Sequence, residues 1–364
     1  MRIVHFVTGG FSGATQVAVD LALAARNDSS NQVLLVLRRK RNTNDDKVQA
    51  LRAQGLDVRV VPSWSHAATV WSLYRLLRTW RADVLLAHGF SDHIWGRMAG
   101  LWARVPLMLH VEHNSRERYT AWRRLQSSWL EAGTACHVGV SEGVRQSLIG
   151  QGFPAHKCVA ISNGVDLERF PAALLPLEWS QRSPTVLMAS RFARQKDHAT
   201  LIHALAILRE RGLVLRLQLA GGGKRGVRRK IEQLVGALRL QQQVEFLGNV
   251  ADLPSRLAHA QMFVLSTHYE GMPLALVEAM AAGCACIGSN VVGVREVLND
   301  GRTGLLVPHQ DAQALADALW RLVSDPALAA RLGTAARQKA MAEYGRQHML
   351  RDYDALLRRL AARP

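Results

Sequence analysis

Short apolar runs alternate with longer amphipathic stretches along almost the whole chain, and this alternation constrains the fold most. In the first half, the pattern is typical of buried strands at 3–7, 32–37, 57–61, 83–87 and 107–111. It is typical of intervening helices at 15–25, 45–54, 67–80 and 94–103. Strands that alternate with helices predict a parallel sheet covered by helices on both faces.

The second half repeats this logic. Strands are predicted at 185–189, 216–220, 244–247, 262–265, 285–287 and 305–307, and helices at 198–211, 227–238, 253–260 and 274–282. Because 364 residues exceed one ordinary core, we expect two doubly wound α/β domains, 1–170 and 171–345. The joint is expected near 170–183, where Pro171, Pro176 and Pro184 cluster, and a last basic helix spans about 346–364.

The net charge of +17 predicts an anionic partner, which could be nucleic acid, an anionic membrane or a phosphorylated substrate. The excess of basic residues occurs in both halves, so it is not a tail. The sequence contains no uncharged apolar run of about 18 residues, so we expect no membrane-spanning helix. The four cysteines show no disulfide or zinc spacing, which fits a reduced, cytoplasmic compartment.

A glycine-rich loop, Gly9-Gly10-Phe11-Ser12-Gly13, follows the first predicted strand. Glycines let a backbone approach an anion, and the next helix N-terminus attracts negative charge. The G-x-G-x-x-G spacing is absent and Arg38-Arg39 stand where a ribose-binding acid would end the second strand, which disfavours an NAD site. The alternative is a plain tight turn.

Two cations flank the loop after the first strand of the second half, Arg191 and Lys196 in the segment SRFARQKD. Cations beside a helix N-terminus suit a diphosphate. The alternative is a solvated basic loop.

A turn into a helix carries two acidic residues, Glu270 and Glu278. Pro273 suits the first helical position, so the N–H groups of Gly271, Met272 and Leu274 would point at a ligand. Glu278 would lie one turn into the helix, where a carboxylate can accept two vicinal hydroxyls, as on a ribose. A helix-dipole role explains Glu270 but leaves Glu278 unexplained on an apolar segment.

Histidines also follow predicted strands, at His88, His110 and His113. A lone histidine is more often structural than catalytic, and three at strand ends raise the odds only modestly. Their spacing permits a metal, but no metal signature accompanies them, so we predict no metal site.

Taken in order, these motifs resemble the family-4 retaining glycosyltransferases of the GT-B fold, over residues 1 to about 355. The resemblance rests on an ordered set: Gly9-Gly10, His113-Asn114, Asn163-Gly164-Val165-Asp166 with Phe170, the segment SRFARQKD, Gly221-Gly222-Gly223, the E-x7-E pair Glu270 and Glu278, and the segment 301–307. Two departures are the missing acidic residues after the glycine pair and within 221–223, which concern details of acceptor and donor binding.

The resemblance implies two Rossmann-like domains facing across a cleft, with 1–170 binding the acceptor, 171–345 binding the nucleotide sugar and the last helix packing back on the first domain. It implies transfer of a sugar from a nucleotide diphosphate sugar, with UDP favoured, to a hydroxyl of a glycan or lipid-linked acceptor. It further implies that the anomeric configuration is retained and that no cofactor or metal is needed. We expect the pathway to be bacterial lipopolysaccharide or surface polysaccharide synthesis.

The resemblance also distributes roles among residues. Arg191 and Lys196, with the Gly10 backbone, would stabilise the leaving diphosphate, and Glu278 would bind the ribose. Glu270 and the amides of 271–274 would hold the donor sugar and phosphates, His113 would face the transferred sugar or the acceptor hydroxyl, and Gly222 and Asn249 would complete the donor site.

Arginines and aromatics interleave at 116–124 with Trp129, around Trp64 to Trp80, and at Trp95 and Trp102. This mixture suits an anionic inner-membrane surface or a lipid-diphosphate acceptor, whereas the alternative is ordinary helices with aromatic core faces. A small soluble acceptor, an epimerase and a basic nucleic-acid-binding protein stay open as other functions. The paired glutamates with Arg191 and Lys196 argue against the epimerase, and no nucleic-acid module is visible.

Overall fold

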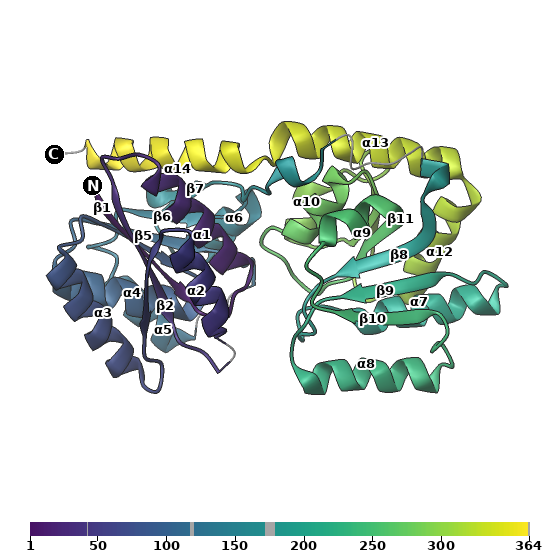
Figure 1. The fold of residues 1–364 in the computed structure, drawn as a ribbon, viewed down its shortest axis with the longest axis horizontal. Helices are drawn as coiled ribbons and strands as arrows, with labels where there is room; N and C mark the ends of the chain where they lie inside the picture. The colour runs from purple at the N-terminus through teal and green to yellow at the C-terminus, as the bar shows by residue number, and fades with distance from the viewer. Residues whose placement is uncertain (42, 117–119, 172–178, 363–364) are drawn as a thin grey trace. The chain divides into compact units, whose positions relative to one another are not determined.

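The computed structural model describes residues 1–41, 43–116, 120–171 and 179–362. The chain divides into two compact units, Met1–Gly164 with Arg346–Pro364 (unit 1) and Val165–Gly345 (unit 2) (Figure 1). This division falls a few residues before the joint predicted at 170/171. Of the prolines used to predict that joint, Pro176 lies outside the described residues.

Unit 1 is built on a parallel sheet in the order β3-β2-β1-β4-β5-β6-β7. Its described strands are β1 (Arg2–Thr8), β2 (Gln32–Arg38), β3 (Asp57–Val61), β4 (Val84–His88), β5 (Leu107–Glu112), β6 (Cys136–Gly139) and β7 (Cys158–Ala160). The first five match the predicted strands. β6 and β7 were not predicted, because they are too short to show a pattern of their own.

Helices cover both faces of this sheet. They are α1 (Gly13–Arg26), α2 (Asp45–Ala53), α3 (His66–Trp80), α4 (Phe90–Ala103), α5 (Ala121–Trp129) and α6 (Glu142–Gly150). One core cluster joins α1 and α2 to residues such as Val7 and Leu35. Another joins α3 and α4 to residues such as Phe6 and Leu85. Because neighbouring residues of a strand point to opposite faces, these two cores lie on opposite sides of the sheet.

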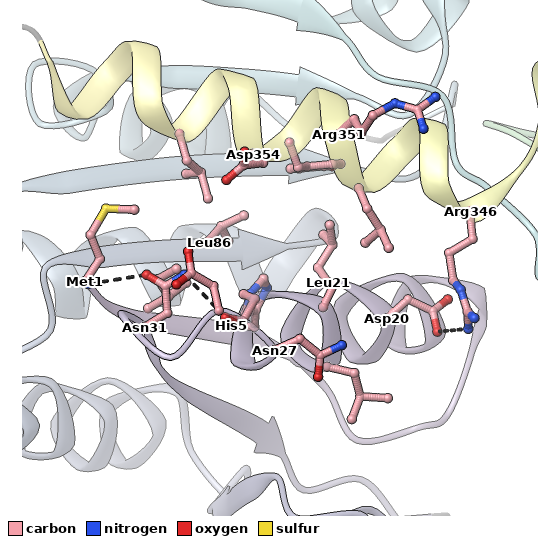
Figure 2. Close-up of a pocket in the computed structure, with 18 of the residues that line it drawn as sticks. Met1, His5, Asp20, Leu21, Asn27, Asn31, Leu86, Arg346, Arg351 and Asp354 are labelled. Carbon is pink, nitrogen blue, oxygen red and sulfur yellow. Dashed lines mark hydrogen bonds and ion pairs between the residues drawn. The ribbon is translucent and has the colours of Figure 1, made fainter.

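The last helix, α14 (Arg346–Ala361), belongs to unit 1 and packs beside α1. The side chain of Tyr353 in α14 is buried, and Arg346 of the same helix forms an ion pair with Asp20 of α1 at 3.8 Å. A cavity of about 540 Å³ lies between α14, α1 and the central strands β1 and β4, and His5 of β1 lines it (Figure 2).

Unit 2 has a second parallel sheet in the order β10-β9-β8-β11-β12-β13. Its strands are β8 (Ser183–Ala189), β9 (Arg216–Ala220), β10 (Val244–Gly248), β11 (Ala260–Leu265), β12 (Ala285–Ser289) and β13 (Leu305–Val307). Its helices are α7 (His198–Glu210), α8 (Arg225–Ala237), α9 (Leu253–His259), α10 (Leu274–Ala281), α11 (Val292–Val297), α12 (Ala312–Ser324) and α13 (Pro326–Glu343). The predicted class, α/β with two Rossmann-like domains, is confirmed.

Within the described part of the chain, no helix combines the length and apolar character that crossing a bilayer requires. The four cysteines are all buried thiols.

Candidate functional site

The strand order of unit 2 reverses between β8 and β11, and ligands of such sheets bind beyond the carboxyl ends of the strands at this switch point. Two loops meet there, one after β8 and one after β11. The N–H of Asp197 donates to the carbonyl of Ser266 at 3.1 Å, and the N–H of His268 donates to the carbonyl of Gln195 at 2.9 Å. These bonds hold the two loops as one surface.

The Lys196 ammonium forms an ion pair with Oε1 of Glu270 at this surface, so the structure brings together two predicted site residues. The Thr267 hydroxyl donates to the same oxygen at 2.7 Å. The side chains of Lys196 and Glu270 are only 14% and 7% exposed. A cation held at a strand end in such low exposure can act on an anionic ligand with little screening by water. Sequence reasoning missed Thr267, whose only signal was its place just after a strand.

Residues 270–274, the donor turn, connect this ion pair to α10. Gly271 and Met272 are buried, and within the described residues no acceptor is recorded for their N–H groups. Buried donors of this kind are normally satisfied, so they indicate a place for a ligand. α10 begins at Leu274, as predicted, but Pro273 is its N-cap and not its first helical residue.

Gly293, the second residue of α11, packs directly against the backbone of the donor turn. A Cβ at this glycine would lie 2.4 Å from the carbonyl oxygen of Gly271. Only a glycine therefore permits this close approach.

Glu278 lies on α10, as predicted, and its Oε1 is 3.3 Å from Nη1 of Arg169. Burial raises the pKa of Glu278, and the Arg169 guanidinium opposes that rise. A half-buried carboxylate with one long ion pair keeps acceptor capacity for hydroxyl groups. Sequence reasoning missed Arg169, which lies more than a hundred residues away along the chain.

Arg191, Gly222 and Asn249 follow β8, β9 and β10, so they lie on neighbouring loops at the same sheet edge. The N–H of Phe192 donates to the carbonyl of Gly222 at 2.7 Å, and Gly222 lies directly against the Asn249 amide. Gly223 has φ +145° and touches the Phe192 backbone, where a side chain would collide. Arg191 is exposed, and no described carboxylate forms an ion pair with it.

In unit 1 the glycine loop follows β1 at the switch point between β1 and β4. Gly9 donates to the carbonyl of Arg38 at 2.8 Å, and Gly10 is partly exposed beside it. Arg38 itself is buried in an ion pair with Asp92 at 2.7 Å. The cation at the end of β2 therefore has a structural partner within unit 1.

His113 lies just after β5 at the end of a row of three imidazoles. Nδ1 of His5 lies 3.3 Å from Nε2 of His88, and Nδ1 of His88 lies 3.2 Å from Nε2 of His113. Burial lowers the pKa of His113 to about 4, so this ring is neutral at neutral pH. The third predicted histidine, His110, does not join this row but faces His137 instead.

Two groups of described residues bring three metal-type donor atoms within 4.8 Å of one another: His93, His110 and Glu112, and Asp197, His268 and His309. The rings of His93 and His110 stack at 3.8 Å and 22°, so their in-plane lone pairs run side by side and do not converge on one ion. Asp197 already accepts bonds from the N–H and hydroxyl of Thr200. We therefore assign neither group as metal ligands.

The aromatic residues of unit 1 divide into two sets. Tyr74, Trp80 and Trp95 pack against the core, as ordinary helix faces do. A second set, which we call the tryptophan surface, is 54–84% exposed and consists of Trp64, Trp71, Trp102, Trp122 and Trp129. Of the basic and aromatic stretch at 116–124, residues 117–119 lie outside the described residues.

Comparison with known proteins identifies the class. Residues 11–169 match the family described as Glycosyltransferase Family 4, and residues 176–339 match Glycosyl transferases group 1. The chain is 28% identical over 273 residues to the UDP-Gal:alpha-D-GlcNAc-diphosphoundecaprenol alpha-1,3-galactosyltransferase of Escherichia coli, covering 71% of this chain and 70% of that protein. It is 30% identical to a GDP-mannose-dependent alpha-(1-6)-phosphatidylinositol monomannoside mannosyltransferase of Mycobacterium tuberculosis, over 58% of each chain.

Among solved structures, Anabaena HepE in complex with UDP and glucose superposes with a TM-score of 0.85 at 20% identity, covering 98% of this chain and 99% of that one. The fold, the two consecutive family matches and the relatives agree. The chain belongs to the family-4, group 1 glycosyltransferases of the GT-B fold. It is a hexosyl-type glycosyltransferase that uses a nucleotide-sugar donor in polysaccharide or glycolipid synthesis.

Proposed function

We propose that this protein is a retaining glycosyltransferase that moves a sugar from a UDP-sugar to a hydroxyl of a glycan or lipid-linked acceptor in bacterial lipopolysaccharide or surface polysaccharide synthesis. One observation carries the proposal: Lys196, Glu270 and the donor turn meet at the β8/β11 switch point. In this proposal unit 2 binds the donor and unit 1 binds the acceptor.

The donor diphosphate needs positive charge because negative charge grows on the leaving phosphate as the C1–O bond breaks. Lys196 and Arg191 supply that charge, and the amides of Gly271 and Met272, with the Gly10 backbone, add N–H donors. Gly222 and Asn249 border the same site. Glu278 accepts the ribose hydroxyls, and Leu274 opens the helix that carries it.

The proposed retention follows from how Glu270 is held. The glycosidase route to retention uses one carboxylate as nucleophile and a second as acid and base. Oε1 of Glu270 already receives Lys196 and Thr267, so this carboxylate orients the cation and the donor sugar. A front-face substitution fits better, in which the leaving phosphate accepts the proton of the acceptor hydroxyl while His113 contacts the transferred sugar.

UDP is favoured because HepE binds UDP and the E. coli relative is named for UDP-Gal, although the M. tuberculosis relative is named for GDP-mannose. A thermal-shift screen with UDP, GDP and ADP tests this choice, since a ligand that binds only the native state raises its stability. At a hundredfold excess over Kd, UDP should add about 2.7 kcal/mol. A larger shift with GDP would overturn the nucleotide assignment, and a shift with none of the three would overturn the donor site.

We further propose that the tryptophan surface contacts the cytoplasmic face of the inner membrane. The helices α3 and α5, which carry Trp71, Trp122 and Trp129, also expose Arg75, Arg78 and Arg124. Tryptophan with arginine suits the interface of an anionic bilayer. Flotation with vesicles containing anionic lipid tests this contact. Trp122→Ser with Trp129→Ser should abolish flotation, whereas Trp320→Ser in unit 2, 39% exposed, is the matched control.

Wild-type protein that stays in the aqueous fraction while it glycosylates a soluble glycan would instead support a small soluble acceptor. Retention of the protein on DNA at physiological salt would favour a nucleic-acid role.

A further inference from the structure

A chain of titratable side chains, all buried except the half-buried Glu131, leads to the loop that carries His113. It begins at Glu131, continues through His137 of β6 and His110 of β5, and ends at Glu112, the last residue of β5. Nε2 of His137 is 3.0 Å from Oε2 of Glu131, and Nδ1 of His137 is 3.1 Å from Nδ1 of His110. Nε2 of His110 is 3.5 Å from Oε2 of Glu112, which is the longest of the three contacts.

Glu112 connects this chain to the loop. Its Oε1 accepts the backbone N–H of His113 at 2.8 Å and that of Asn114 at 3.1 Å. The side chain is 2% exposed, so these two donors depend on it rather than on water. The direction in which the backbone leaves β5, and with it the position of His113, follows from the orientation of this carboxylate.

The three contacts require three protons, but two neutral imidazoles supply only two. The Glu131 carboxylate takes the Nε2–H of His137, which leaves Nδ1 of His137 as an acceptor. That atom takes the Nδ1–H of His110, so Nε2 of His110 presents a lone pair to Oε2 of Glu112. Among the described residues, the buried Nε2 of His110 has no hydrogen-bond partner.

We propose that Glu112 is a positioning residue for the His113–Asn114 loop, and that its buried chain holds one proton more than two neutral imidazoles provide, shared between His110 and Glu112. The extra proton closes the third contact and fixes the carboxylate. The link to activity rests on the proposed function, in which His113 contacts the transferred sugar.

Several titratable or charged groups face the shared proton. They are His93 and Arg97 of α4, His137 of β6, His113, and Glu131 with its partner Lys157. Burial lowers the pKa of His110 well below its usual range, so a full positive charge on this ring is disfavoured. Either location gives the same total number of bound protons, and that number is what a titration of the pair measures.

The substitution Glu112→Gln separates this arrangement from the alternatives. A glutamine can donate an amide N–H to Nε2 of His110 while its carbonyl accepts the two backbone N–H groups. It therefore completes all the contacts without an extra proton. Glu112→Leu has the bulk but provides none of these bonds, and leaving buried N–H groups unsatisfied should lower the folding equilibrium constant at least about tenfold.

Urea unfolding of both wild type and Glu112→Gln between pH 7 and pH 9 tests the proton count. Above pH 7 an unfolded chain has an ionised glutamate and mostly neutral histidine, so the native wild type binds one more proton than the unfolded chain does. Stability then falls as pH rises, and the folding constant of wild type should drop about tenfold per pH unit relative to Glu112→Gln. Parallel pH profiles, or a stoichiometric metal ion that elemental analysis finds in wild type only, would overturn the proposal.

Sugar transfer gives the second readout. Glu112→Leu should lose transfer and raise the KM for the acceptor, Glu112→Gln should restore both, and UDP affinity should be equal in all three proteins. If Glu112→Leu does not fold, sugar transfer by Glu112→Gln decides the positioning role. Transfer at the wild-type level supports that role, because only an intact loop supports transfer, and lost transfer overturns it. If no protein transfers sugar but the pH profiles differ as expected, the proposed function fails and the proton count stands.

Discussion

Replacing Lys196 by alanine should affect stability and catalysis by separable amounts. The change leaves the Glu270 carboxylate, 7% exposed, without its cation. Removing one partner of a buried ion pair costs about 3–5 kcal/mol. Glu270 keeps the Thr267 hydroxyl at 2.7 Å and a weak contact with the Gln195 amide at 3.4 Å, so we expect the lower end, about 3 kcal/mol.

A second variant, Lys196→Ala with Glu270→Gln, removes the uncompensated charge. Because a neutral amide costs far less to bury, most of the lost stability should return. Turnover should not return, since the cation that we propose stabilises the leaving diphosphate is still missing. A preorganised group of this kind is worth about a hundredfold to a thousandfold in kcat.

Urea unfolding measures the stability of the three proteins, and release of UDP from the UDP-sugar during transfer measures kcat. Circular dichroism at low urea confirms that each variant is folded. The reasoning is refuted if the double variant regains wild-type kcat, because Lys196 would then serve only to neutralise Glu270.

Three further predictions follow from the site. Glu278→Ala should weaken UDP binding, measured by calorimetry, at least about tenfold, because hydrogen bonds to a charged acceptor are lost. The melting temperature should change little. Unchanged affinity would show that Glu278 does not bind the ribose. Gly293→Ala should push the donor turn out of place and lower both stability and UDP affinity, since its Cβ would lie 2.4 Å from a backbone oxygen; a variant with wild-type affinity would show that the turn adapts. Burial lowers the pKa of His5 to about 3 and those of His113 and His198 to about 4, so the unfolded chain binds more protons than the native protein below pH 6.5. The free energy of unfolding should therefore fall as pH drops from 6.5 to 4, by up to about 4 kcal/mol per pH unit. A flat pH profile in denaturant titrations would contradict this.

The parallel sheets could be predicted because buried strands of this class are continuous apolar runs, as at 32–37 and 262–265. Cys136–Gly139 and Cys158–Ala160 could not, because strands of four and three residues are too short to show a recognisable pattern. The start of α10 at Leu274 was predicted, but Pro273 is its cap and not its first helical residue. Proline is compatible with both the cap and the first helical position, and tertiary packing of the turn decides between them.

Only some residues of the candidate site could be predicted from the sequence. Charged residues near glycines, such as Lys196 and Glu270, could be singled out because their position after a strand indicates a ligand. Their partners Thr267 and Arg169 could not, since contacts between distant segments leave no local signal. The histidines were grouped by sequence position, but the register of β5 turns His110 toward His137 and leaves His113 beside His88.

The place of α14 has a consequence for how the protein forms on the ribosome. Unit 2 is one continuous segment, Val165–Gly345, and all its strands and helices have been synthesised before α14 exists. The surface of unit 1 around Leu21 and His5 stays exposed until α14 has been synthesised and its Tyr353 and Leu357 pack against that surface. Vectorial synthesis therefore exposes the N-terminal half to chaperones for longer, although that half emerges first.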